Sequence, residues 1–438
     1  MKPKLILLFL SYFFVINCVA QETVIFTTLE EVYAYAEANS ISFRNASQQS
    51  ILVKYQTLAS KLGMFNLKGT GSFTLTDNIK LNPNFIPAEV FGGPEGTFRT
   101  ITFGQKYVSN FTFEPQIDLI NPYAIAQIKV SKANEQLTAV TNLLTKKEVY
   151  ESISAAYHNI LSYRWQIDVA TKSLDNAESL VFFLQNKQKE GLARSQDVNT
   201  TLANQLLVKD KLQQLEIQLQ QQYNGLKILC DINPGTDIII AGNENPVLDI
   251  QLPIKATGDL LQRQGEWQTK YQQATLRANK RWMYPTLNLF SSFSWQESNN
   301  NNWFGTNNWF GSNYIGLKVS IPILPEVSKI ATVKQNRINL EIAQNNWNHN
   351  KLQDQINNNQ LELDYRKAYE SYKINTEIEA LQKDSYEKNL NIYLEGIISA
   401  TDLINSFEDW LNSSLNTVAL IASVEYAKSK IIISNTIK

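Results

Sequence analysis

Residues 190–198 read EGLARSQDV, and residues 395–403 read EGIISATDL. Three residues recur at an offset of 205, so that Glu190, Gly191 and Asp197 match Glu395, Gly396 and Asp402. Earlier in each half, FTFEPQIDLINPYA (111–124) is answered by LKVSIPILPEVSKIA (317–331) at an offset of 207. Landmarks in one order at nearly one offset indicate an internal duplication, so the chain is predicted to hold two copies of a unit of about 200 residues.

A long helical stretch without proline precedes each of the two EG turns. The stretches run from about residue 123 to 189 and from about 327 to 394, and shorter helices are predicted to return to about 229 and 433. Nearly 70 residues at 1.5 Å each make a rod of roughly 100 Å. A rod of this length requires a coiled coil or lengthwise packing against other helices.

Two stretches with alternating apolar residues lie upstream of each rod. In the second copy the alternating positions include Leu287, Leu289, Phe293, Leu317 and Val319. Period-two alternation predicts strands. The simplest interpretation is that their apolar side chains only cover a hydrophobic core. About nine residues also suffice for a tilted strand in an outer membrane, where these side chains would face lipid. Four strands leave open edges, so a membrane barrel would need two or three chains.

Composition excludes several classes of protein. With 43% hydrophobic residues the chain is not disordered, and two Cys and two His exclude a disulfide scaffold and a conventional Cys/His metal site. The net charge of −1 gives no basis for nucleic-acid binding. No nucleophile elbow or phosphate loop is present. We therefore predict no catalytic residues, no cofactor and no enzyme activity, and we interpret His158 and His349 as ordinary histidines.

The first twenty residues have the layout of a secretory signal peptide. Lys2 and Lys4 precede an apolar run over residues 5–16, with the predicted cleavage after Ala20. Acylation of Cys18, as in a lipoprotein, is the alternative. The predicted organisation is a signal peptide over 1–20, a first repeat over 21–230, a connector over 231–255 that contains Pro246 and Pro253, and a second repeat over 256–438.

This order of elements resembles the TolC-like outer membrane efflux protein family. The marks are LEEVYAYAEANS (29–40), WMYPTLNLFSSF (282–293), VSIPIL (319–324) and the two turns. Asn66 departs from the pattern, since the second copy has Pro285 there. The first strand pair is also twelve residues longer, because Met64 to Pro115 spans 51 residues and Met283 to Pro322 spans 39.

The resemblance implies a mainly α fold with a small β portion, built from a duplicated helix–strand–strand–long helix–turn–helix unit. It implies a homotrimer with a twelve-stranded transmembrane β-barrel and a twelve-helix periplasmic α-barrel. The implied location is the outer membrane of a Gram-negative bacterium, extending into the periplasm. The implied partners are outer-membrane lipid, a periplasmic adaptor (membrane fusion) protein, and an inner-membrane pump or ABC exporter.

The two turns are the predicted site of adaptor docking. Each glycine is expected in a left-handed conformation, with Ser195 or Thr401 capping the return helix. The docking set is Gly191, Arg194, Ser195, Asp197, Gly396, Thr401 and Asp402. The alternative is that these residues only form a good helical turn, and Arg194 has no charged counterpart in the second copy.

An aperture gate is a second predicted site near the turns. Rings of acidic side chains favour cations and close a pore through hydrogen bonds and ion pairs. The candidates are Gln185, Gln188, Glu190, Asp384, Glu387 and Glu395. The alternative for each is a solvated outer helix face.

The sequence as a whole predicts a passive exit duct of a tripartite efflux or type I secretion system, for small molecules or polypeptides. The alternatives are a structural or adhesive coiled-coil protein of the cell envelope and an adaptor protein. Two matched strand pairs favour the duct, because neither alternative needs them. No sequence feature selects the transported substrate, although metal export is disfavoured by two His and the two Met that follow the predicted signal peptide.

Overall fold

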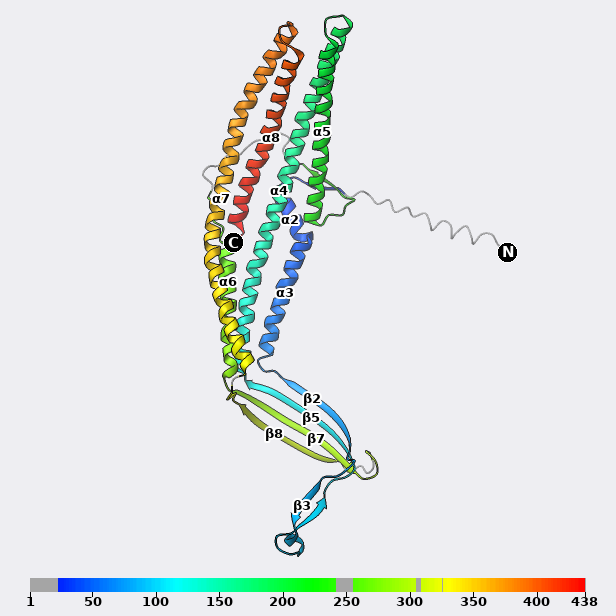
Figure 1. Ribbon diagram of the computed structural model, residues 1–438, viewed down its shortest axis with the longest axis vertical. Helices are drawn as coiled ribbons and strands as arrows, with labels where there is room; N and C mark the ends of the chain where they lie inside the picture. The colour runs from blue at the N-terminus through cyan, green and yellow to red at the C-terminus, as the bar shows by residue number, and fades with distance from the viewer. Residues whose placement is uncertain (1–22, 242–254, 305–308, 325, 438) are drawn as a thin grey trace, which may run out of the picture. The chain divides into compact units, whose positions relative to one another are not determined.

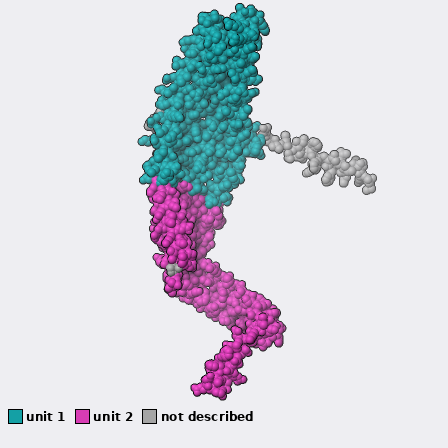
Figure 2. All heavy atoms as spheres, viewed as in Figure 1, with its two compact units in different colours: residues 1–49, 140–263, 349–438 teal, residues 50–139, 264–348 magenta. Residues whose placement is uncertain are grey.

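The computed structural model describes residues 23–241, 255–304, 309–324 and 326–437. The predicted signal peptide and most of the predicted connector, including Pro246 and Pro253, lie outside the described residues. The chain forms two compact units (Figure 2). The first, which we call the helical unit, comprises residues 1–49, 140–263 and 349–438, and the second, the sheet unit, comprises residues 50–139 and 264–348. Each unit therefore draws on both halves of the sequence.

Two helices of 68 residues dominate the chain (Figure 1). They are α4 (Pro122–Lys189) and α7 (Val327–Leu394), followed by the return helices α5 (Ser195–Cys230) and α8 (Ala400–Thr436). Proline at the first position of α4 fits a helix start, and the Asn121 side chain caps it by accepting a hydrogen bond from the Ala124 N–H at 3.1 Å. The predicted rods and return helices are confirmed.

The opening helical segment of the first half is divided in the structure. It forms α2 (Leu29–Asn39) and α3 (Ile41–Leu62), whereas the second half has the single helix α6 (Leu260–Lys280). The division falls at Ser40, whose extended backbone ends α2 while its N–H bonds to the Ala36 carbonyl at 2.8 Å. α2 packs in a core that includes Val32, Ile160 and Leu226, beside the parallel pair β1 (Thr23–Phe26) and β6 (Asp237–Ile240).

The sheet unit contains a four-stranded antiparallel sheet. Its order is β2 (Lys68–Asp77), β5 (Tyr107–Ile120), β7 (Thr286–Asn299) and β8 (Phe310–Ser320), so β5 and β7 join the two halves of the sequence. β5 and β7 each have 14 residues and are longer than expected, because their pairing runs past a bulge between Asp118 and Ile120. Among the described residues, the outer edges of β2 and β8 pair with no strand.

A second, two-stranded sheet accounts for the longer first strand pair. The residues between β2 and β5 form β3 (Pro83–Pro87), the 3-10 helix η1 (Ala88–Phe91) and β4 (Phe98–Thr102). In the second half, the described residues between β7 and β8 form no strand or helix. The extra length predicted from the sequence is therefore a hairpin of its own.

Candidate docking tips and sheet wall

The two turns have the same backbone geometry. Gly191 and Gly396 both have φ of 78°, which confirms the predicted left-handed glycines. In the first turn the N–H of Gly191 donates to the Gln188 carbonyl at 2.9 Å, and the N–H of Leu192 donates to the Lys187 carbonyl at 2.8 Å. This pair of bonds is a Schellman motif, which satisfies carbonyls at the end of a helix.

The second turn repeats this motif. The N–H of Gly396 donates to the Tyr393 carbonyl at 2.9 Å, and that of Ile397 donates to the Ile392 carbonyl at 3.2 Å. A Cβ at Gly396 would meet no atom within 4 Å, so space does not require glycine there. The requirement comes from the backbone, because L side chains rarely adopt this φ.

The prediction that Ser195 or Thr401 caps a return helix is wrong. An N-cap has extended backbone, and both residues already lie inside their helices. In the second turn the cap is Ser399, which accepts from the Asp402 N–H at 3.2 Å while its own N–H donates to the Asp402 carboxylate at 3.2 Å. The cap of the first turn is Arg194, whose side chain makes no capping bond.

The two turns share a groove of about 530 Å³ within the helical unit. Lys187, Arg194 and Asp197 line it from the first turn, and Tyr393, Glu395, Gly396 and Ser399 line it from the second. Burial raises the pKa of Tyr393, and the nearby Asp197 carboxylate raises it further. Four members of the predicted docking and gate sets therefore meet here, namely Arg194, Asp197, Glu395 and Gly396.

Two exposed aliphatic residues at the turns were missed by the sequence prediction. Leu192 is 67% exposed and Ile397 is 70% exposed, and each directly follows its turn glycine. The signal was present in the sequence, because EGL and EGI place an aliphatic side chain at the same position of both copies. Exposed aliphatic groups at matched positions are typical of a contact surface.

The predicted gate residues are exposed in the described structure, and only Glu395 lines the groove. Asp384 pairs with Lys388 at 2.6 Å, and Glu387 pairs with Lys383 at 3.9 Å, both on α7 itself. The Gln188 carbonyl takes part in the first turn. Each of these two candidate carboxylates thus has its charge offset by its own lysine. The aperture gate stays a prediction.

The sheet has one apolar face and one polar face. Strand register aligns Leu287 with Val319 and Leu289 with Leu317 across β7 and β8. Phe293 lies beside Phe113 of β5, with ring centroids 6.3 Å apart. Leu317 and Val319 are more than half exposed. The predicted alternation is confirmed, since Ser, Thr, Asn and Lys dominate the opposite face.

Groups capable of chemistry are sparse in the described chain. Burial lowers the pKa of His158 to about 4, and its ring lies 3.1 Å from the Ser429 hydroxyl. Burial raises the pKa of the Cys230 thiol to about 12, which leaves it an unreactive thiol. Among the described residues no three His, Cys, Asp or Glu gather where a metal ion would bind. None of the described helices is long and apolar enough for a membrane span.

No protein-family model and no curated protein matches the sequence. Solved structures do match the fold over 93% of this chain. The outer membrane protein VceC from Vibrio cholerae is 14% identical with a TM-score of 0.75 over 95% of its own chain. The Campylobacter jejuni CmeC outer membrane channel is 15% identical with a TM-score of 0.71 over 85% of its chain. The outer-membrane channel OprN is 13% identical with a TM-score of 0.75 over 89% of its chain. The chain therefore has the fold of the outer-membrane channels, and the resemblance inferred from its sequence is confirmed at the level of fold.

Proposed function

We propose that this protein is the passive outer-membrane exit duct of a tripartite efflux or type I secretion system. It carries small molecules or polypeptides outward and is not an enzyme. The observation that carries the proposal is the four-stranded sheet. It has an exposed apolar face, two edges that pair with no strand in the described part of the chain, and direct connections to 68-residue helices. The fold likeness to VceC, CmeC and OprN supports the same assignment.

The open edges of the sheet are the argument for a homotrimer. In lipid an unpaired strand edge leaves backbone groups without hydrogen bonds, so β2 and β8 need partners. Pairing β8 of one copy with β2 of the next satisfies both edges and closes a barrel. Three copies give twelve strands, the number that the family resemblance implies. The apolar face, with Leu287, Leu289 and Val319, then contacts outer-membrane lipid, and the polar face lines the lumen.

The helices then continue into the periplasm. Each rod measures roughly 100 Å at 1.5 Å per residue, and in this proposal it extends across the periplasm toward the inner-membrane partners. Three copies of two rods and two return helices give a twelve-helix barrel. The described polar and charged helix surfaces are compatible with an aqueous surrounding.

We assign the two turns, residues 190–198 and 395–403, to contact with a periplasmic adaptor, and we call them the docking tips. Two turns of nearly equal geometry in each chain give six tips in a trimer, and Leu192 and Ile397 offer exposed apolar contacts on them. Arg194, Asp197 and Ser399 add polar contacts along the groove between the turns. An adaptor that binds here would present matched apolar side chains flanked by polar groups.

Membrane fractionation combined with chemical crosslinking tests this proposal. We expect the protein in the outer membrane, with crosslinked products ending at three copies. Deletion of the gene should abolish export of the substrate served by its inner-membrane partner. A soluble periplasmic monomer as the main species would contradict the duct, and it would favour the coiled-coil structural or adaptor alternative.

A further inference from the structure

The helix ends next to the four-stranded sheet are strongly basic. The sheet-proximal residues of α3, α4, α6 and α7 are 52–62, 122–133, 270–280 and 327–337, all within the sheet unit. They contain ten Lys and Arg and no Asp or Glu, in a chain whose net charge is −1. The antiparallel topology brings all four helix ends to one end of the sheet. This basic belt is a surface suited to an anionic partner.

A cavity of about 290 Å³ lies within this belt. It is lined by Tyr123, Asn279, Trp282, Lys329 and Thr332, which come from α4, the end of α6, the 3-10 helix η2 (Arg281–Met283) and the start of α7. The Lys329 ammonium lies 4.9 Å from the centre of the Trp282 ring. The polar groups of this lining are rich in hydrogen-bond donors and include one cation.

Trp282 lines this cavity, and its indole N–H is an unused donor beside it. Its nitrogen is buried and has no hydrogen-bond partner among the described residues. An indole nitrogen can only donate, and most buried donors in folded proteins are paired. A ligand with an acceptor oxygen would supply the missing partner. Lys329, a flexible side chain that also pairs with Glu326 at 3.4 Å, is able to turn toward the same oxygen.

Exposed apolar residues lie close in sequence to the residues that line the cavity, and we call them the apolar rim. Ile323, Leu324 and Val327 precede and begin α7 and are each more than 80% exposed. Tyr284, which follows Trp282 by two residues, is 55% exposed. Apolar and aromatic groups beside lysines are typical of the boundary between acyl chains and headgroups. A free phosphate ion would use the donors but not this apolar rim.

We propose that the cavity binds the phosphate group of an anionic phospholipid in the periplasmic leaflet of the outer membrane. Lys329 and the Trp282 N–H contact the phosphate, and the apolar rim contacts the first acyl carbons. The rest of the basic belt raises the local concentration of anionic lipid. This inference rests on the proposed function, because it requires the sheet to span the membrane.

Native mass spectrometry of the trimer extracted from outer membranes in detergent tests the site. The trimer is incubated with dioleoyl phosphatidylglycerol or with dioleoyl phosphatidylcholine, which share acyl chains and differ in net charge. We expect phosphatidylglycerol to be retained about fivefold more, the change expected of one lysine at an anionic surface. Inorganic phosphate should not displace it.

Three variants locate the binding. Lys329→Gln should lower phosphatidylglycerol retention about fivefold, whereas Lys329→Arg should preserve it. Trp282→Phe keeps an aromatic side chain but removes the N–H donor and should also lower retention. The matched control is Lys172→Gln in the helical unit, where an exposed lysine pairs with Asp168 on its own helix. That variant should retain lipid as the wild type does.

Two results would overturn the inference. The first is equal retention of both lipids by wild-type trimers from the outer membrane, which leaves the proposed function intact. The second is wild-type retention by Lys329→Gln and Trp282→Phe trimers alike. If fractionation instead finds no wild-type protein in the outer membrane, the proposed function and the lipid site fail together.

Discussion

Gly191 and Gly396 lie 205 residues apart and share a φ of 78°, each in a Schellman motif that ends a 68-residue helix. Both glycines are exposed, and each is followed by an exposed aliphatic residue. The tips are therefore built twice to one plan, although only the second has a capping box.

Valine at both glycines should disrupt the tips without affecting the sheet. A left-handed backbone costs an L residue about 1–2 kcal/mol, and β-branching makes it less favourable still. For Gly191→Val/Gly396→Val we expect export and adaptor crosslinking to fall together, with outer-membrane abundance nearly unchanged. Gly225→Ala is the control, since Gly225 lies within α5 with open space around it. Normal export and crosslinking in the double variant would contradict docking at the tips.

The two caps should respond differently to substitution. Ser399→Ala removes the two bonds of the Ser399 hydroxyl, which accepts from the Asp402 N–H at 3.2 Å and donates to the Asp402 carboxylate at 2.7 Å. The backbone N–H bond to Asp402 remains, and the loss should cost about 1 kcal/mol of local stability. Arg194→Ala removes no capping bond and should cost little. Arg194→Ser should instead stabilise the first turn, because Asp197 already stands three residues later, where a capping box needs it. Amide hydrogen exchange in the first turns of α5 and α8 measures these changes. Equal effects of Ser399→Ala and Arg194→Ala would contradict the assignment of Ser399 as the cap with side-chain bonds.

An arginine on the apolar face of β8 should destabilise the membrane-inserted protein. Ile315→Arg, in the middle of β8 and on the same face as Val319, should cost about 2–4 kcal/mol. Lys318→Gln, on the opposite face of the same strand, should cost little. The measurement is the free energy of folding from urea into lipid vesicles, obtained by titration with denaturant, for the arginine variant and for Lys318→Gln. Equal tolerance would show that the apolar face does not contact lipid.

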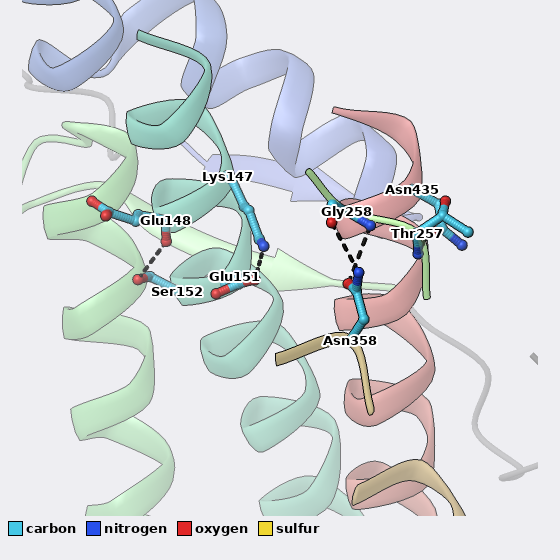
Figure 3. Close-up of polar contacts among 8 residues, drawn as sticks. All are labelled: Lys147, Glu148, Glu151, Ser152, Thr257, Gly258, Asn358 and Asn435. Carbon is cyan, nitrogen blue, oxygen red and sulfur yellow. Dashed lines mark hydrogen bonds and ion pairs between the residues drawn. The ribbon is translucent and has the colours of Figure 1, made fainter. Parts of the chain in front are cut away.

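Gly258 is fixed against α7 and α8 in the helical unit (Figure 3). Its N–H donates to the Asn358 side chain at 3.1 Å, and its carbonyl accepts from the same amide at 2.9 Å. A Cβ at Gly258 would collide with the buried Ser434 hydroxyl. Gly258→Ala should therefore lower stability by about 1–3 kcal/mol.

Removal of the Ser434 hydroxyl should relieve this collision. The next nearest atoms to the added Cβ are 3.4 Å away, which is tight but tolerable. We expect Gly258→Ala/Ser434→Ala to be more stable than Gly258→Ala in thermal unfolding, a non-additive result typical of residues in contact. If the changes in unfolding free energy of the two single variants simply add in the double variant, the cost of Gly258→Ala does not come from the collision with Ser434.

His158 should make the helical unit sensitive to acid. Burial lowers its pKa from 6.5 to about 4, so the folded protein holds the imidazole neutral while the unfolded chain protonates below about pH 6.5. Its stabilising effect is complete above that pH and is lost as pH falls toward 4, by up to about 3 kcal/mol. Thermal unfolding between pH 7 and 4 should show a smaller loss for His158→Gln than for the wild type and for the exposed-site control His349→Gln.

The helices and strand faces could be predicted because they depend on local pattern. The absence of proline over residues 123–189 and 327–394 and the period-two alternation of β7 and β8 are visible in the sequence itself. The caps could not be placed from the sequence. Ser399 and Thr401 are both suitable N-cap residues, and the choice between them depends on the exact residue at which α8 begins, which sequence patterns locate only to within one or two residues. The pairing of β5 with β7 joins distant segments, and no local signal reports it. The groove between the turns likewise brings together segments about 200 residues apart, and no local signal reports it.

A disulfide between edge strands of different copies is the most direct test of the duct. Ser72→Cys on β2 is combined with cysteines along the same face of β8, beginning with Ser312→Cys and Ser320→Cys, in a Cys230→Ala background. Within one chain β2 and β8 are separated by two strands, about 14 Å, which is too far for a disulfide. Oxidation in intact cells should yield linked dimers and trimers at the β8 position that pairs with Ser72. Monomers at every tested position, with the protein verified in the outer membrane, would contradict closure of the sheet into a barrel.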